Sequence, residues 1–207
     1  GYKYLGICDH GGKLKIAHAL NEKRLEKQIK EIEKINRKFD DFVILKGIEV
    51  DILADGSLSL KNEVLKKLDI VTASIHSGFK MTKEKMTARI LKAMDNEHVK
   101  IIGHPTGRII QKREPYALDL EKIFDKAKER KIALEINAFP DRLDLNDLNI
   151  REAIKRKVKL VINTDSHFSK HLEFMELGIA QARRGWASKN DILNSLNLKE
   201  LKRWLEK

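Results

Sequence analysis

Cysteine is almost absent from this sequence: Cys8 is the single one among 207 residues. One thiol cannot form an internal disulfide, so nothing in the chain requires an oxidising compartment, and we expect a cytoplasmic protein. Cys8 lies in an apolar run, where we expect it to be buried as a small hydrophobic side chain. Proline is also sparse, with 3 residues, and no low-complexity linker divides the chain.

Long hydrophobic runs are missing as well. No segment approaches the roughly 20 apolar residues that span a bilayer, so we expect no membrane association. The hydrophobic content of 42% is ordinary for a globular protein, and the length allows a substantial core. The sequence begins Gly-Tyr-Lys-Tyr, without methionine, and we expect a fragment of a longer protein.

Charge, in contrast, is plentiful. The formal net charge is +11 and 35% of the residues are charged. The positive balance favours polyanionic partners and permits nucleic acid without establishing it. The abundance of both Lys and Glu is also typical of the ion-pair-rich surfaces of heat-adapted proteins.

Short β-branched segments alternate with amphipathic ones along the chain. Strands are predicted at 4–8, 42–52, 70–75, 99–102, 132–138 and from 160. Helices are predicted at 21–39, 62–68, 82–94, 118–130, 148–157 and 170–184, with two short ones near the end. This order predicts parallel βαβ units. No glycine-rich phosphate-binding motif follows a strand, so a barrel or part of one fits better than a doubly wound sheet.

Residues of the types that bind metal ions stand at the ends of most predicted strands. They are His10, Glu49, His76, His104, Asp165 and His167. The strand ends of a β/α barrel form one rim, so we expect these side chains to meet there. For Asp165 and His167 alone, a helix cap and a surface histidine would be an equally good interpretation. Four of the 7 histidines at strand ends favour a metal site.

The ligand types restrict the metal and the reaction. Imidazole and carboxylate without thiolate suit Zn, Mn or Fe. Glu49 and Asp165 could each bridge two ions, and paired ions activate water and stabilise an in-line phosphoryl displacement. We therefore predict hydrolysis of a phosphate ester. The remaining histidines, His18, His98 and His171, lie in predicted loops or helices and are assigned no role.

The loops beyond these strand ends carry cations that suit a phosphate-bearing substrate. Arg108 and Arg142 are predicted to be functional, whereas Lys112 and Arg113 are expected to be solvated surface charges. Asn137 can face the rim, but Glu135 is an acid in an apolar strand and needs a buried partner. The segment 183–186, Arg-Arg-Gly-Trp, is expected to end a helix with its aromatic ring packed on the barrel.

Several motifs occur together and in order. They are Cys8-Asp-His10, Gly47-Ile-Glu-Val-Asp51, Ala73-Ser-Ile-His76-Ser-Gly-Phe, Gly103-His-Pro-Thr-Gly-Arg108, Leu134-Glu-Ile-Asn-Ala138, Asp141-Arg-Leu-Asp-Leu-Asn146 and Ile162-Asn-Thr-Asp-Ser-His167. Together they resemble the PHP (polymerase and histidinol phosphatase) domain found at the C-terminus of bacterial and archaeal family X DNA polymerases. The resemblance covers nearly the whole chain as one domain, residues 1–207.

The resemblance implies an α/β fold, a distorted (β/α)7 barrel of TIM-like type. It also implies a multinuclear Mn or Zn centre and 3′-to-5′ exonuclease action on DNA 3′ ends in DNA repair, beside the polymerase domain of the same parent chain. The implied metal ligands are His10, Glu49, His76, His104, Asp165 and His167. The implied contacts to DNA phosphate are Lys80, Arg108 and Arg142.

One family feature is not found in the sequence: a first His-x-His motif followed by an Asp. We therefore expect the first strand–helix unit and three ligands to be missing, an unpaired edge on the strand at 4–8, partial metal occupancy and weak or lost catalysis. Two alternatives stay open, a small-molecule phosphatase of the histidinol phosphatase kind and a non-catalytic module that binds DNA or stabilises its polymerase. Steep salt dependence would favour a DNA-binding protein.

Overall fold

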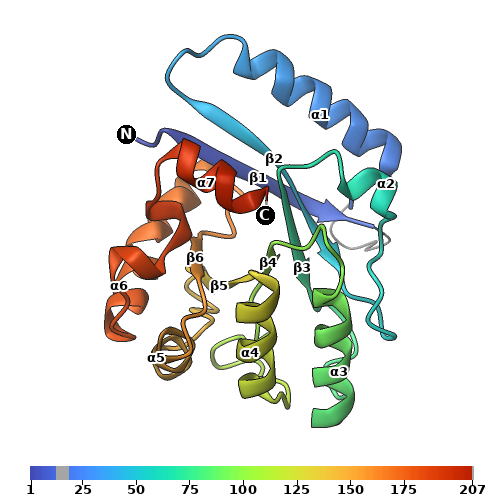
Figure 1. Cartoon of the computed structure of the whole chain (residues 1–207), viewed down its shortest axis with the longest axis vertical. Helices are drawn as coiled ribbons and strands as arrows, with labels where there is room; N and C mark the ends of the chain where they lie inside the picture. Colours follow the sequence, from blue (N-terminus) through green and yellow to red (C-terminus); the bar gives the residue numbers. More distant parts are fainter. Residues whose placement is uncertain (13–18, 207) are drawn as a thin grey trace.

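The computed structural model describes residues 1–12 and 19–206; His18 therefore lies outside the described residues. Its centre is an all-parallel sheet in the order β1-β2-β3-β4-β5-β6, curled into a half-barrel (Figure 1). The strands are β1 (Tyr4–Gly11), β2 (Val43–Asp51), β3 (Ile70–Ser74), β4 (Ile101–Ile102), β5 (Ala133–Asn137) and β6 (Leu160–Asn163). The strand order never reverses, as it would in a doubly wound sheet, so the predicted alternation and the barrel-like curvature are confirmed.

Helices cover the outside of this sheet (Figure 1). They are α1 (Glu22–Asn36), α2 (Asn62–Leu65), α3 (Lys83–Met94), α4 (Leu120–Arg130), α5 (Asp147–Lys155) and α6 (Met175–Arg184), whereas α7 (Leu198–Leu205) packs against the inner face at the strand starts. Short polar side chains begin most of them: Asn21 accepts a hydrogen bond from the Arg24 N–H and Thr82 accepts one from the Lys85 N–H. The predicted capping box of Asn197 and Glu200 is present at the start of α7.

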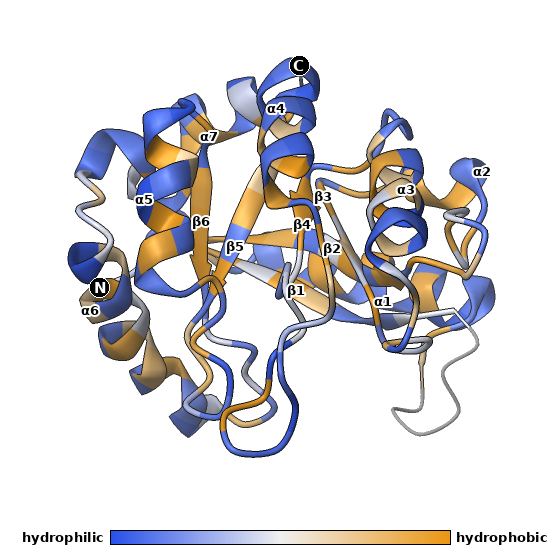
Figure 2. Cartoon of the chain, turned by 90° about the horizontal axis from the view of Figure 1, so that it is seen from below, coloured by the Kyte–Doolittle hydropathy of each residue, from blue (hydrophilic) through white to orange (hydrophobic). Residues whose placement is uncertain are grey.

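The two faces of the sheet bury different side chains because successive strand residues point in opposite directions. The outward residues of β2, among them Ile48 and Val50, join the core under the helices. Figure 2 shows the strands mainly in hydrophobic colours and the helices with hydrophilic outer sides. The inward residues at the strand starts, among them Leu45 and Ile70, form a second cluster that includes Leu201 and Leu205 of α7. Helix α7 therefore fills the starting end of the half-barrel.

Further along each strand the inward side chains become polar. On β5, Ala133 belongs to the inner apolar cluster, and it is followed at two-residue steps by Glu135 and Asn137. On β2, the inward series runs from Leu45 through Gly47 to Glu49. The half-barrel is thus apolar at one end and polar at the other, where the strands finish.

Several predicted boundaries were wrong. Strand β1 does not stop at Cys8, because its pairing with β2 continues through His10 opposite Glu49 to Gly11. Helix α1 ends at Asn36, so Phe39 lies beyond it and is 50% exposed. The helix predicted over 170–184 begins as a 3-10 helix, η2 (Ser169–Phe174), before α6 starts.

The aromatic residue after α6 was also misplaced. Trp186 is 71% exposed and does not pack on the sheet; instead the Arg151 guanidinium lies over its ring, 3.7 Å from the centroid. This cation–π contact stabilises an exposed ring without burying it.

Among the described strands, β1 pairs only with β2; its other edge is bonded by Leu20 beside Gly11 and is otherwise open, as expected for most of its length. None of the described helices is long and apolar enough to cross a bilayer. The Cys8 side chain packs against the inner apolar cluster, and burial raises the pKa of its thiol to about 12. A thiol in this environment stays protonated, as expected for a small hydrophobic residue.

Helix α6 approaches the sheet at Gly178, and a larger residue there should destabilise the fold. A Cβ atom at this position would lie 2.4 Å from Ile162 Cγ2 and 2.8 Å from the Ala138 Cβ. Overpacking outweighs the better helix propensity of alanine, so Gly178→Ala should lower the free energy of unfolding by about 1 to 2 kcal/mol. Urea denaturation measures this. Ile179→Ala, at an exposed position of the same helix, is the control and should change stability by less than ~0.5 kcal/mol.

Candidate metal centre

The polar end of the half-barrel gathers four of the predicted ligands. His10 near the end of β1 stands directly opposite Glu49 of β2 in the sheet register. His76 follows β3 by two residues, which puts it on the same side of the strand as the inward Ser74. His104 follows β4 by two residues, at the start of the long β4–α4 loop (103–119). Parallel strands therefore bring together residues that are far apart in the sequence.

Glu49 is the centre of this group. Its carboxylate oxygens lie 3.1 Å from His10 Nδ1, 3.4 Å from His76 Nε2 and 3.0 Å from His104 Nε2. The rings of His10 and His76 are edge to face at 5.1 Å, and those of His76 and His104 at 5.2 Å. One ligand atom each from His10, Glu49 and His76 lies within 4.8 Å of the others, a grouping that can hold a metal ion.

The electrostatics of this cluster favour positive charge. Burial by itself would raise the pKa of Glu49, but the close contacts with His104 and His76 and their charge outweigh it and hold that pKa well below its ordinary value. Burial would lower the pKa of His76, yet its contacts with Asp51 and Glu49 raise it to about 9. Glu49 is therefore ionised, and the cluster stabilises a cation beside it.

The buried nitrogen atoms of the cluster fit a metal ion. His10 Nδ1 and His76 Nε2 have no hydrogen-bond partner, although each faces the Glu49 carboxylate. A metal ion beside Glu49 would take the place of the imidazole proton and give these nitrogen atoms a partner. Imidazole with carboxylate is also a donor set that Zn, Mn and Fe accept.

Asp51 supports the cluster from behind and was not among the predicted site residues. Its Oδ1 lies 2.6 Å from His76 Nδ1, so this carboxylate fixes the ring and directs Nε2 toward Glu49. Carboxylate partners of this kind orient the histidines of metal sites. The sequence held a signal for it, since Asp51 follows Glu49 by two residues on one strand and so shares its face.

A second polar network connects His104 to the last strand. The buried Glu135 accepts hydrogen bonds from the His104 backbone N–H at 2.5 Å, from Asn137 Nδ2 at 3.2 Å and from Asn163 Nδ2 at 2.8 Å. These are the partners that an acid in an apolar strand requires. Burial raises the pKa of Glu135 to about 7, and the charge of Asp165 adds to this.

Asp165 and His167 lie at the side of the cluster. Asp165 Oδ2 accepts a hydrogen bond from Asn137 at 3.1 Å and lies 3.5 Å from Arg142 Nε. The side chain of His167 is 58% exposed, with its ring 6.4 Å from that of His10. Its Nδ1 lies 2.9 Å from the Asp165 carbonyl oxygen. The structure thus joins four predicted ligands closely and places these two at the rim.

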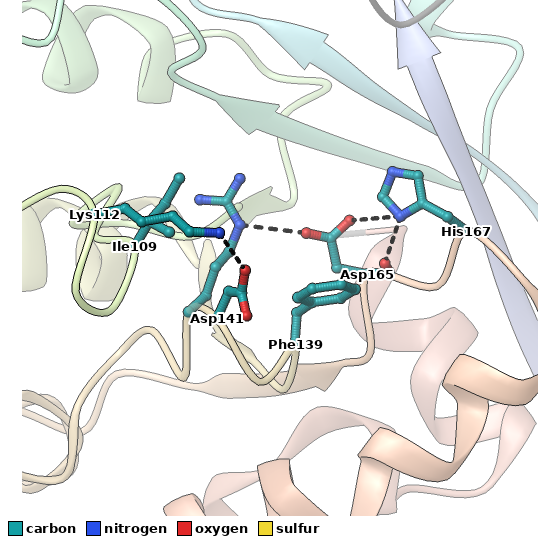
Figure 3. A pocket seen from close by; sticks show the side chains of 7 residues that line it. Ile109, Lys112, Phe139, Asp141, Asp165 and His167 are labelled. Carbon is teal, nitrogen blue, oxygen red and sulfur yellow. Dashed lines mark hydrogen bonds and ion pairs between the residues drawn. The ribbon is translucent and has the colours of Figure 1, made fainter.

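A cavity of about 210 Å³ opens next to Asp165 and His167. Figure 3 shows Ile109 and Lys112 on one side of it, Asp165 and His167 on the other, and Phe139 between. Arg142 also lines it, and the Nη1 atom of Arg142 is buried without a hydrogen-bond partner. The cationic side chains of Arg142 and Lys112 make the lining of this cavity suited to an anionic group.

The other predicted cations are placed differently. Arg108 donates from Nε to the Arg142 carbonyl at 2.7 Å and from Nη2 to the Leu143 carbonyl, so it ties two loops together. Arg113 is not a solvated surface charge: it donates to the Gly107 carbonyl at 2.7 Å and lies over the Phe79 ring. Lys112 is exposed and pairs with Asp141 at 3.3 Å, and Lys80 is exposed in the turn after His76.

Arg89 of α3 is a further residue that sequence reasoning missed. Its buried guanidinium donates to the carbonyls of Leu53 and Ser77, both at 2.8 Å, and to that of Ile52. It thereby fixes the segments that follow β2 and β3 and hold Asp51 and His76. Only the three-dimensional structure shows this, because a single Arg in an amphipathic helix is ordinarily exposed.

Asp51→Asn should weaken metal binding without abolishing it. The amide cannot supply the charge that stabilises the His76 ring, so the dissociation constant for Mn²⁺ or Zn²⁺ should rise roughly 10- to 100-fold. Isothermal titration calorimetry measures this directly. Asp55→Asn, at an exposed carboxylate 3.8 Å from Lys92, should leave the affinity unchanged. Equal affinities in both variants would show that Asp51 does not orient His76.

The fold and the cluster together define an α/β protein with a half-barrel of parallel strands whose ends can hold a metal ion. No protein-family model matches the chain. The chain is 43% identical over 207 residues to the DNA polymerase/3′-5′ exonuclease PolX of Bacillus subtilis, covering 100% of this chain and 36% of PolX. It is 33% identical over 179 residues to a probable phosphatase of Clostridium acetobutylicum, covering 82% of this chain and 68% of that protein.

A probable phosphatase of Thermoanaerobacter pseudethanolicus is 32% identical over 209 residues, covering 94% of this chain and 79% of that protein. The chain belongs to the PHP family of hydrolases, as its motifs indicated. It spans about a third of the length of PolX and most of the length of the phosphatases.

Proposed function

We propose that the chain is a metal-dependent phosphodiesterase of the PHP family that processes DNA 3′ ends with 3′-to-5′ exonuclease chemistry. The observation that carries this proposal is the ionised, partly buried Glu49 with three imidazoles within 3.4 Å of its oxygens. Beside it lies a cavity that Arg142 and Lys112 line with positive charge. The cluster suits a hydrolytic metal, and the cavity suits the phosphate of its substrate.

The proposed metal ligands are His10, Glu49, His76, His104, Asp165 and His167. When bound, Mn or Zn would supply Lewis-acid polarisation of the phosphate and activation of water. The chain itself keeps Glu49 ionised, fixes His76 through Asp51 and holds His104 through its N–H bond to Glu135. Arg142 would bind the substrate phosphate, with Lys80 further out, while Arg108 keeps the Arg142 loop in place.

DNA as substrate is supported by the net charge of +11 and by the PolX relative, which is named as a polymerase and a 3′-5′ exonuclease. We propose that residues 1–207 act as one PHP domain beside a polymerase domain of the same parent chain. The resemblance also implies a barrel of seven strands, and the open edge of β1 is where another strand can pair.

A second candidate function is hydrolysis of a small phosphomonoester. It is favoured by relatives that are named probable phosphatases and that match most of this chain. The same cluster and cavity would serve that reaction, with the phosphate of a metabolite in place of a DNA phosphate.

The experiment that separates these functions compares substrates in the presence of Mn²⁺ or Zn²⁺. A DNA enzyme should shorten a 5′-labelled single strand from its 3′ end and lose activity steeply as salt is raised. A small-molecule phosphatase should instead release phosphate from a phosphomonoester and leave the labelled strand intact. Absence of both activities with metal bound would refute the hydrolase proposal and favour a non-catalytic module.

A further inference from the structure

The segment after β6 carries a line of aromatic rings that the proposed reaction does not use. Phe168, His171 and Phe174 are spaced by three residues: His171 and Phe174 belong to the 3-10 helix η2, and Phe168 is its N-cap. A 3-10 helix has three residues per turn, so side chains at this spacing align. The Phe168 and His171 rings are 5.2 Å apart, and the His171 and Phe174 rings are stacked at 4.9 Å.

These rings continue to the cavity beside the metal centre. Phe139 lines that cavity and contacts the rings of His171 at 5.5 Å and Phe174 at 5.4 Å. Phe139 also faces His167 at 6.4 Å, and His167 in turn faces His10. We call Phe139, Phe168, His171 and Phe174 the aromatic ridge. It leads from the proposed site of hydrolysis to the protein surface.

The inner and outer ends of the ridge differ in their packing. Phe174 is half-buried against the core under the helices, so its packing contributes to the stability of the fold. Phe168 is 72% exposed at the outer end, so the fold gains little from it. The next residues are polar, with Lys170 exposed on the same 3-10 helix. An exposed ring at the end of a row of rings, with a lysine two residues away in sequence, has the composition of a base-stacking surface.

We propose that the aromatic ridge is a stacking site for unpaired nucleobases, with Phe168 as its outermost platform. This deepens the proposed function, on which it depends: the backbone of the strand would pass Arg142 while bases upstream of the reacting phosphate stack on the ridge. A small phosphomonoester has no bases to place there. The net charge of +11 complements such a strand, and rings without sequence-specific hydrogen bonds tolerate any base.

Binding of labelled oligothymidylate, measured by fluorescence anisotropy in EDTA so that no cleavage occurs, tests this site. Phe168→Ala should bind roughly tenfold more weakly than the parent, and Phe168→Trp should bind as well as the parent. An oligomer of the same length with abasic residues keeps every phosphate, so its affinity should be the same for the parent and Phe168→Ala.

Phe39→Ala is the matched control, because Phe39 is also an exposed phenylalanine, at 50%, but lies at the opposite end of the strands. It should bind both oligomers like the parent. The proposal is overturned if Phe168→Ala binds oligothymidylate like the parent, or if it loses the same affinity for both oligomers. Metal-dependent hydrolysis of bis(p-nitrophenyl) phosphate by the parent tests the hydrolase proposal separately, since that readout needs no stacking.

Discussion

Replacing Glu49 with glutamine is expected to reduce metal-dependent phosphodiester hydrolysis about a thousandfold. Glutamine keeps the shape of the side chain but removes the negative charge that faces His10, His76 and His104 within 3.4 Å. The stabilisation that a metal supplies to a phosphoryl displacement amounts to several kcal/mol, and each 1.4 kcal/mol is tenfold in rate. Loss of the ion therefore removes most of the rate.

Metal binding by calorimetry is the direct readout for Glu49→Gln, and circular dichroism shows whether the variant is folded. Asp55→Asn removes one exposed carboxylate that pairs with Lys92 and should keep the affinity and the rate of the parent. If folded Glu49→Gln binds Mn²⁺ and Zn²⁺ as tightly as the parent, the cluster around Glu49 is not the metal centre.

The alternation of strands and helices could be predicted from the sequence because it depends on local hydrophobic periodicity. Outward residues such as Ile48 and Val50 alternate with inward ones such as Glu49, so a strand with one apolar face could be read directly. The convergence of His10, Glu49, His76 and His104 followed from one further rule, that parallel strands end on one side.

The parts that could not be predicted depend on partners that are distant in sequence. Arg113 and Arg108 carry the same charge in the same loop, yet each is fixed by carbonyls that only the folded loops bring near. The exposure of His167 depends on its loop geometry, because Asp165, two residues earlier, has a left-handed backbone with φ of 52°. A residue pattern contains no information on such a turn unless glycine marks it.

Asp144 shows most clearly how a contact between distant segments escapes prediction from sequence. Asp144→Ala should lower the free energy of unfolding by roughly 3 to 5 kcal/mol, because three buried donors lose their acceptor. Asp144 is fully buried. Its carboxylate accepts hydrogen bonds from the Thr106 N–H at 2.9 Å, the Thr106 hydroxyl at 2.8 Å and the Gly107 N–H at 2.9 Å. Burial raises the pKa of Asp144, and the hydrogen bonds from Thr106 oppose this.

Urea denaturation of Asp144→Ala, followed by circular dichroism, measures the loss. Asp119→Ala is the matched control, because Asp119 accepts one backbone hydrogen bond at the exposed start of α4 and its removal should cost only ~1 kcal/mol. Thr106 follows His104 by two residues, so a loosened β4–α4 loop should also weaken metal binding in the part of the Asp144→Ala population that stays folded. Equal losses of stability in the two variants would contradict this prediction. They would mean that the donors of Thr106 and Gly107 bind water once the carboxylate is gone, and that Asp144 does not fix the His104 loop to the segment after β5.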